Sequence, residues 1–145
     1  MSTPWAEPRL CAQPQDTEAL GAELAEAMRA GDVVLLEGPL GAGKTCLTRG
    51  IARGLGADPG AVLSPTFALV REVPGGRLAL HHVDLYRLQG PQEAAGLGLE
   101  ELFDGDGLSV VEWPERLGPF SPAGAWRVSL QVLPDGSREA RCLRP

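Results

Sequence analysis

Lysine is nearly absent from this sequence. Lys44 is the only lysine among 13 basic residues in a chain of 145, and the other twelve are arginines. A GTPase switch selects guanine through an N-K-x-D motif, which would need a second lysine, so the sequence argues against this class. The single lysine is informative in another way. A compact ammonium fits a narrow binding site that the wide planar guanidinium of arginine would not fit.

Cysteines and long apolar runs are scarce as well. Cys11, Cys46 and Cys142 are widely spaced, with no C-x-x-C pair and no histidine at metal spacing, so no zinc site or disulfide framework is expected. No run approaches the roughly 18 apolar residues of a membrane span, and the N-terminus lacks a charged-then-apolar signal pattern. We therefore expect a cytoplasmic protein with buried or half-buried thiols and no contact with a membrane.

Positive charge is in the minority. The net charge of −6 and the pI near 4.9 argue against a broad electrostatic surface for nucleic acid. The length predicts one domain over residues 1–145 and is short for a fold with a separate substrate lid. Residues 1–8 carry two prolines and no periodicity, so we expect a loose N-terminus there.

The segment from Val33 to Arg49 contains an apolar run, a glycine-rich turn and the start of a helix, in that order. Within it, residues 38–45 read GPLGAGKT and match the phosphate-loop pattern G-x-x-x-x-G-K-[ST] at every fixed position. Glycines let backbone N–H groups point at phosphate oxygens, and the helix N-terminus adds partial positive charge. We expect Lys44 to reach the β- and γ-phosphates and Thr45 to offer its hydroxyl to Mg²⁺. The residues expected to bind the nucleotide are Gly38, Leu40, Gly41, Ala42, Gly43, Lys44, Thr45 and Cys46.

Two apolar strands are predicted to end in acids. One leads into Asp84 and the other into Glu112. An acid at the carboxyl end of a buried strand beside a phosphate loop can hold magnesium or orient the attacking water, and either acid could do so. His82 shares a strand face with Asp84 by the period of two and either orients a group there or is a half-buried core residue. Trp113 either closes over the site or belongs to the core.

The rest of the chain predicts alternating strands and helices in an α/β fold. A helix over 17–30 is expected to be capped by Asp16, and the phosphate-loop helix is expected over 44–55 with Gly56 ending it. Two hairpins are expected, one from strands 67–73 and 78–83 and one from strands 126–133 and 138–143. Further strands are expected at 9–12, 33–36 and 108–111, and one or two short helices within 91–104.

Four segments together resemble the TsaE family, formerly called YjeE. They are GPLGAGKT at 38–45, SPTF at 64–67, H-x-D-L-Y-R at 82–87 and E-W-P at 112–114. The resemblance runs in order through nearly the whole chain. It implies a P-loop NTPase-like fold with a mixed parallel and antiparallel sheet flanked by helices. It also implies a small ATPase that uses ATP and Mg²⁺, hydrolyses ATP slowly alone, and works with TsaD and TsaB to make threonylcarbamoyladenosine in tRNA.

The resemblance also implies roles for single residues. Lys44 would hold phosphates and act in catalysis, Thr45 and Glu112 would hold magnesium, and Asp84 would support hydrolysis. Ser64, Pro65 and Thr66 would form a switch, and Thr17 and Arg138 would lie beside the nucleotide base. Trp113 is expected beside the nucleotide because it directly follows Glu112, not because of the resemblance. The sequence departs from the family at Cys46, where a second threonine or serine is usual, and at Pro39, where an acid is common.

Two other functions share the phosphate loop and the magnesium site. A small-molecule or nucleotide kinase is one, although no second arginine-lined lobe for an acceptor is visible in the sequence. A nucleotide-gated scaffold with incidental turnover is the other. Turnover of ATP and GTP, with and without the partners and tRNA, distinguishes these classes.

Overall fold

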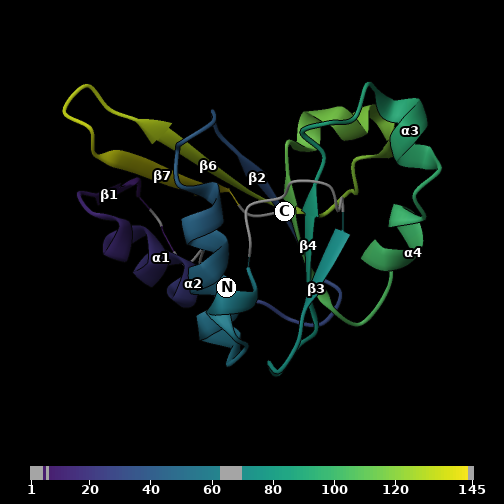
Figure 1. Cartoon of the computed structure of the whole chain (residues 1–145), viewed down its shortest axis with the longest axis horizontal. Helices are drawn as coiled ribbons and strands as arrows, with labels where there is room; N and C mark the ends of the chain where they lie inside the picture. The colour runs from purple at the N-terminus through teal and green to yellow at the C-terminus, as the bar shows by residue number, and fades with distance from the viewer. Residues whose placement is uncertain (1–4, 6, 63–69, 144–145) are drawn as a thin grey trace.

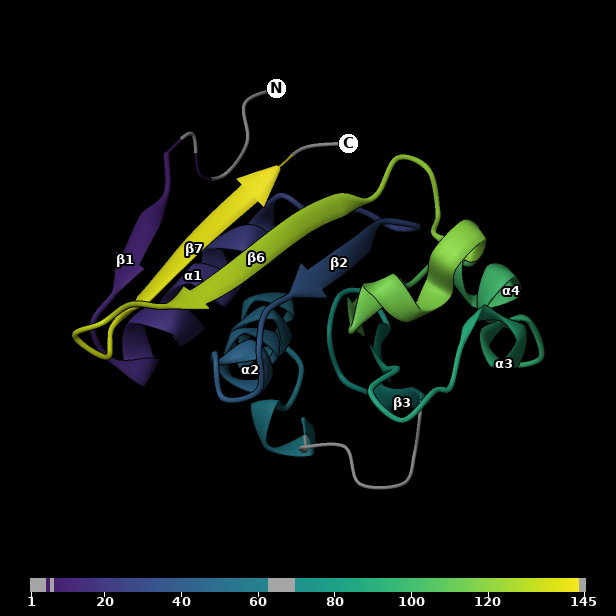
Figure 2. The same cartoon turned by 90° about the horizontal axis from the view of Figure 1, so that it is seen from above.

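The computed structural model describes residues 5, 7–62 and 70–143. In these residues the strands form one seven-stranded mixed sheet with the order β1-β7-β6-β2-β5-β4-β3 (Figures 1 and 2). The strands are β1 (Arg9–Cys11), β2 (Val33–Glu37), β3 (Val70–Val73), β4 (Leu80–Asp84), β5 (Leu108–Glu112), β6 (Trp126–Val132) and β7 (Arg138–Leu143). The expectation of an α/β fold with a mixed sheet is confirmed.

The centre of the sheet is parallel and its two sides are antiparallel. Strand β2 pairs in parallel with β5 and β6, and β4 pairs in parallel with β5. The pairs β3 with β4, β6 with β7, and β1 with β7 are antiparallel. Both predicted hairpins are therefore confirmed, and the apolar run of β2 lies at the centre, where both faces of a strand are covered.

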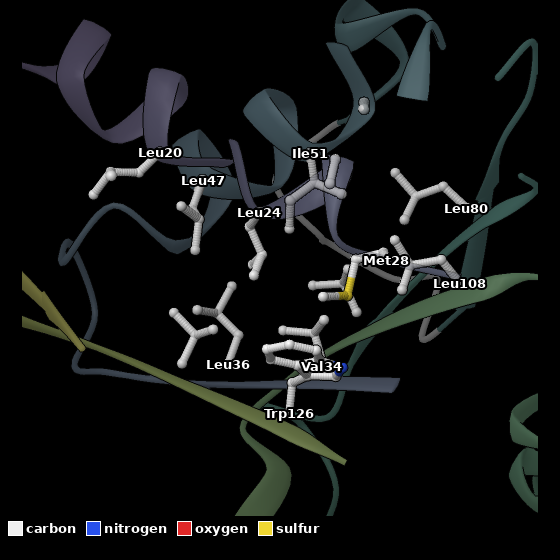
Figure 3. Close-up of a cluster of buried hydrophobic side chains, with 14 of the residues drawn as sticks. Leu20, Leu24, Met28, Val34, Leu36, Leu47, Ile51, Leu80, Leu108 and Trp126 are labelled. Atoms are coloured by element: carbon white, nitrogen blue, oxygen red, sulfur yellow. The ribbon is translucent and has the colours of Figure 1, made fainter. Parts of the chain in front are cut away.

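The helices lie on both sides of this sheet. They are α1 (Pro14–Glu26), α2 (Lys44–Leu55), α3 (Pro91–Ala95) and α4 (Leu99–Phe103), with 3-10 helices η1 (Pro59–Ala61) and η2 (Pro114–Phe120). Helices α1 and α2 pack on the face that carries Leu36 and Val110, as Figure 3 shows around Leu24, Leu36 and Ile51. Residues of α3, α4 and η2 cluster with Leu35 and Val111 on the opposite face. The alternation of strand side chains thus builds two cores.

Helices α1 and α2 approach so closely that glycine is required between them. A Cβ atom on Gly50 of α2 would lie 2.0 Å from the carbonyl oxygen of Glu18 in α1. A Cβ atom on Gly21 of α1 would lie 2.2 Å from the carbonyl oxygen of Leu47 in α2. Both contacts are with backbone atoms, so no side-chain rotation relieves them. The position of α2, whose first turn carries Lys44, is therefore fixed against α1.

The helix expected over 17–30 starts earlier than predicted. It begins at Pro14, and Gln13 rather than Asp16 is the N-cap residue. Asp16 lies in the first turn, where its carboxylate accepts a hydrogen bond of 2.9 Å from the backbone N–H of Gln13. Proline is favoured at the first helical position because the N–H that it lacks would have no helical partner there. The assignment of Asp16 as the cap was wrong for this reason.

The same helix also ends earlier, at Glu26 instead of Ala30. Arg77, from the turn between β3 and β4, donates hydrogen bonds of 2.5 and 3.2 Å to the carbonyl oxygens of Ala25 and Met28. The Ala25 carbonyl also accepts from the backbone N–H of Met28 at 3.1 Å, and the arginine adds a side-chain donor at this C-terminal end of the helix. A contact from a residue about fifty positions away thus helps to set the boundary.

The other expected elements are confirmed within the described residues. The bounds of α2 agree with the prediction, with Gly43 before it and Gly56 after it, and residues 91–104 form two short helices. The predicted switch, Ser64, Pro65 and Thr66, and the first residues of the strand expected from Phe67 lie outside the described residues. A search of the described helices finds none that is long and apolar enough to cross a membrane.

Candidate active site

The phosphate loop connects the end of β2 to the start of α2. Three of its glycines have positive φ angles: Gly38 at 157°, Gly41 at 79° and Gly43 at 100°. A Cβ atom on Gly38 would lie 2.8 Å from the carbonyl oxygen of Leu130 on β6, so a side chain has no room there. Gly41 has nothing within 4 Å of a Cβ position, and Leu40 is 66% exposed. The loop is therefore held at its base and open at its tip.

Lys44 is buried at the start of α2, with 5% of its surface exposed. Its Nζ donates a hydrogen bond of 2.6 Å to the carbonyl oxygen of Gly38 and lies 3.7 Å from the centre of the Trp113 ring. Burial lowers the pKa of Lys44, while the nearby carboxylates, chiefly Glu112 and then Asp84, act in the opposite direction. An ammonium in this position attracts the anionic oxygens of a phosphate group.

Asp84 and Glu112 lie side by side. They are the last residues of β4 and β5 and face each other in the parallel register of these strands. Both are buried, with 7% and 3% of their surface exposed. Since β5 also pairs with β2, the two acids lie at the edge of the sheet where the phosphate loop begins. The structure thus brings together Lys44, Asp84 and Glu112, as the sequence predicted.

Each acid has a different hydrogen-bond donor. Asp84 accepts a bond of 2.8 Å from the backbone N–H of Tyr86, and Glu112 lies 2.5 Å from Nε2 of His82. Burial raises the pKa of Asp84, and the hydrogen bond from Tyr86 acts against this shift. A buried carboxyl with a raised pKa accepts a proton more readily than an exposed one, which suits a group that orients or deprotonates water.

Trp113 follows Glu112 directly and has an unusual backbone. Its φ of 58° and ψ of 49° lie in the left-handed region, and it is the only non-glycine residue with positive φ in the described chain. The turn directs its ring to the ammonium of Lys44, and the ring centre of Tyr86 lies 5.1 Å away. Strained residues of this kind are frequent at functional sites. The ring closes one side of the site, and its contact with a nucleotide stays a prediction.

The remaining predicted residues surround the loop. Thr45 and Cys46 are half-buried in the first turn of α2, and the thiol of Cys46 donates to the carbonyl oxygen of Pro14 at 3.1 Å. Thr17 is buried, and its methyl group lies 3.7 Å from a Cβ position on Gly43. Arg138 donates a hydrogen bond of 3.0 Å to the carbonyl oxygen of Gly41. Contacts of Thr17 and Arg138 with a nucleotide base stay predictions, as do contacts of Thr45 and Cys46 with the nucleotide.

Sequence reasoning missed two features of this site. Glu115 is a third carboxylate close enough to act on the charge of Lys44, and it lies on η2, three residues after Glu112. The bond between His82 and Glu112 joins residues 30 positions apart. The H-x-D spacing indicated the face of His82, but its partner depends on the register of two strands and could not be read from the sequence.

The residues present fit a magnesium nucleotide better than a metal held by protein alone. Among the described residues, no group of three or more His, Cys, Asp and Glu side chains could hold an ion. Mg²⁺ in nucleotide sites usually binds one or two protein ligands together with phosphate oxygens and water. The two neighbouring carboxylates provide such a partial set of ligands, while the buried ammonium and the open glycine loop suit the phosphate groups.

Comparison with known proteins identifies relatives over most of the chain. Residues 11–140 match the model of the TsaE family, described as threonylcarbamoyl adenosine biosynthesis protein TsaE. A tRNA threonylcarbamoyladenosine biosynthesis protein TsaE from Nostoc sp. is 44% identical over 134 residues, which cover 89% of this chain and 80% of the relative. The protein of the same name from Treponema pallidum is 42% identical over 125 residues, covering 86% and 91%.

A solved structure is similar as well. The crystal structure of YdiB from Bacillus subtilis superposes with a TM-score of 0.77 at 34% sequence identity. The match covers 92% of this chain and 82% of that one. The likeness therefore extends over most of the chain, well beyond the phosphate loop.

Proposed function

Because this chain belongs to the TsaE family, whose members act in threonylcarbamoyladenosine biosynthesis, we propose that it is an ATPase of this tRNA modification. It binds ATP with Mg²⁺ at the phosphate loop and hydrolyses it slowly alone. It works with the TsaD and TsaB homologues of its organism and reaches tRNA through that complex. The observation that carries the proposal is the buried ammonium of Lys44 beside Asp84 and Glu112 at the base of a complete phosphate loop.

Each residue of the site has a role in this proposal. The loop backbone and Lys44 bind the phosphates, and Trp113 covers the ammonium on the side of its ring. Thr45 and Glu112 hold the ion, which neutralises charge on the phosphates when bound. Asp84, with its raised pKa, orients the attacking water. The carboxylates around Lys44 favour its protonated form against the effect of burial.

The partners follow from charge and from the family. A net charge of −6 repels tRNA at long range, so we expect weak binding to free tRNA. Stable association with TsaB and TsaD is expected to depend on the nucleotide. A bound γ-phosphate and magnesium can order a neighbouring switch segment, for which Ser64 to Phe67 stay the prediction from the sequence.

Turnover measurements with a full set of partners test this function. Phosphate release is followed with ATP and with GTP, for the chain alone, with TsaB and TsaD, and with tRNA added. The proposal expects slow ATP hydrolysis alone, acceleration by the partners and no use of GTP. Transfer of phosphate to a small acceptor would identify a kinase. Partner binding that depends on nucleotide, with turnover that the partners do not change, would identify a scaffold.

Affinity for the partners is the second measurement. Calorimetric titration against TsaB and TsaD is carried out with ADP and with a non-hydrolysable ATP analogue. Because only a ligand that prefers one state can shift an equilibrium, different affinities in the two nucleotides are the expected result. Equal affinities, or tight binding of tRNA without partners at physiological salt, would contradict the proposed link between nucleotide and partner.

A further inference from the structure

His82 and Glu112 form a buried contact between two neighbouring strands. Nε2 of His82 lies 2.5 Å from Oε2 of Glu112, and each residue has 3% of its surface exposed. A carboxylate that ligates a metal ion is ionised and can only accept hydrogen bonds, so in that state Nε2 of His82 is the donor of this contact. The contact engages one of the two carboxylate oxygens and thereby restricts the direction of the other.

The register of the sheet produces this contact. On β4 and β5, His82 lies opposite Val110, and Asp84 lies opposite Glu112. His82 therefore reaches Glu112 diagonally, on the same face of the sheet as Asp84. The short spacing H-x-D thus supplies two parts of the site from one strand, namely an acid and the donor that holds the acid of the next strand.

We propose that His82 is a positioning residue that holds the carboxylate of Glu112 in the orientation in which it receives Mg²⁺. The inference rests on the proposed function, since that function assigns the ion to Glu112. Hydrogen bonds to a ligating carboxylate orient it, and loss of such a partner commonly reduces metal affinity or activity by about 10- to 100-fold. His82 contacts Glu112 directly, so its proposed effect on the ion passes through this carboxylate.

A substitution at His82 can test this role without removing the hydrogen bond to Asp84. That hydrogen bond comes from the backbone N–H of Tyr86, which a change at His82 does not remove. A substitution at His82 therefore deletes the donor to Glu112 and leaves the donor to Asp84. The expected defect is in the use of magnesium, and the binding of nucleotide without the ion is expected to persist.

The chain contains a matched control for His82. It has two histidines, and the other is the adjacent His81. Successive side chains of a strand point to opposite faces, so His81 faces away from Glu112 and lies opposite Ser109 of β5. It is half-buried. The same substitution at His81 removes an imidazole from the same strand without removing the donor to Glu112.

The test is calorimetric titration of a non-hydrolysable ATP analogue at a series of magnesium concentrations, including none. The proteins are the wild type, His82→Leu, His82→Gln and His81→Leu, and the melting temperature of each is recorded. We expect His82→Leu to raise the magnesium concentration at half-maximal effect by about 10- to 100-fold, with affinity in the absence of magnesium nearly unchanged. His82→Gln should recover most of this loss because its amide also donates, and His81→Leu should behave as the wild type.

The outcomes separate the positioning role from a packing role. An unchanged magnesium dependence in folded His82→Leu would overturn the inference, as would equal defects in His82→Leu and His82→Gln. If His82→Leu does not fold, His82→Asn replaces it, because its amide is one methylene shorter than that of Gln and falls short of Glu112. If the nucleotide affinity of the wild type does not depend on magnesium, the proposed function itself is overturned. If the wild type depends on magnesium and folded His82→Leu shows the same dependence, only the positioning role is overturned.

Discussion

Asp84 and Glu112 occupy the same position on adjacent parallel strands, so their side chains leave the sheet next to each other. Their surroundings differ, because Asp84 is bonded to a backbone N–H and Glu112 lies against the imidazole of His82. Two acids with different partners are suited to different tasks. The division proposed for them is that Glu112 holds the ion and Asp84 acts on water.

This division predicts different defects for two isosteric variants. Glu112→Gln is expected to raise the magnesium concentration needed for activity, because it removes the charge that holds the ion. Asp84→Asn is expected to lower turnover and leave nucleotide affinity nearly unchanged, as loss of a group that acts in the transition state would. Steady-state kinetics over a range of magnesium concentrations measure both. Equal shifts in magnesium dependence for the two variants would contradict the division.

Removal of the ammonium is expected to inactivate the site. Lys44→Ala should reduce turnover by about a hundredfold or more and weaken ATP binding, because the phosphate charge loses a preorganised donor. Lys44→Arg should not restore activity, since a planar guanidinium does not fit between the Gly38 carbonyl and the Trp113 ring. Arg53→Ala, which removes an exposed cation from the same helix, is the control and should retain turnover. Turnover of Lys44→Ala at the wild-type rate would mean that the active site lies elsewhere.

Arg138 is expected to support the phosphate loop from the neighbouring hairpin. Arg138→Ala removes its hydrogen bond to the Gly41 carbonyl and should weaken ATP binding by about 3- to 10-fold, since a partly exposed bond of this kind contributes about 1 kcal/mol. Arg141→Ala is the matched control, because Arg141 lies on the same strand and pairs with Glu139. Equal affinities of the two variants for ATP in calorimetry would show that Arg138 does not contribute to nucleotide binding.

The contact between α1 and α2 predicts an effect on stability. Gly50→Ala improves helix propensity by about 1 kcal/mol, yet its Cβ would overlap the Glu18 carbonyl oxygen. We expect the variant to lose about 1 to 3 kcal/mol in free energy of unfolding. Gly96→Ala is the control, since its φ of −82° suits alanine and the nearest atom is 3.7 Å from the Cβ position. Urea denaturation measures both, and similar stabilities would show that the helices separate easily.

The thiol of Cys142 predicts an effect of alkaline pH. Burial raises its pKa from 9.0 to about 11, so the folded chain keeps the thiol neutral where the unfolded chain ionises it. This contribution to stability is complete below pH 9.0 and is lost as the pH rises through about 11. A rise of the thiol pKa from 9.0 to about 11 corresponds to about 3 kcal/mol in the free energy of unfolding.

Urea denaturation between pH 8 and pH 11 checks this effect by comparing the wild type with Cys142→Ala. The free energy of unfolding of the wild type should fall between about pH 9 and pH 11 as this contribution is lost, and Cys142→Ala should lack this fall. The comparison uses the change with pH, so the cavity left by alanine cancels. Parallel curves for the two proteins would contradict a buried neutral thiol at Cys142.

Local signals in the sequence predicted one helix well and another poorly. The bounds of α2 agree with prediction because Gly43 and Gly56 adopt the left-handed angles that begin and end it. Helix α1 starts earlier than expected because Gln13 rather than Asp16 caps it, and it ends earlier where Arg77 binds the carbonyl oxygens of Ala25 and Met28. A capping arginine from a distant turn leaves no trace in the local sequence.

The candidate site was predictable to a similar extent. The phosphate loop and the two strand-end acids carry local patterns, and parallel strands bring the acids to the loop. The contact of His82 with Glu112 and the position of Glu115 depend on strand register and on the path of the chain after β5. The left-handed turn at Trp113, which directs the ring to Lys44, also carries no sequence signal.

The burial of Lys44 affects how free energy is divided between folding and binding. Its ammonium leaves water when the chain folds, and its partners at that stage are the Gly38 carbonyl and the Trp113 ring. The cost of removing its hydration therefore belongs to the folding equilibrium, where it lowers the stability of the empty protein. An arriving phosphate meets a cation that has already lost most of its water, so affinity for the anion is gained at the expense of stability.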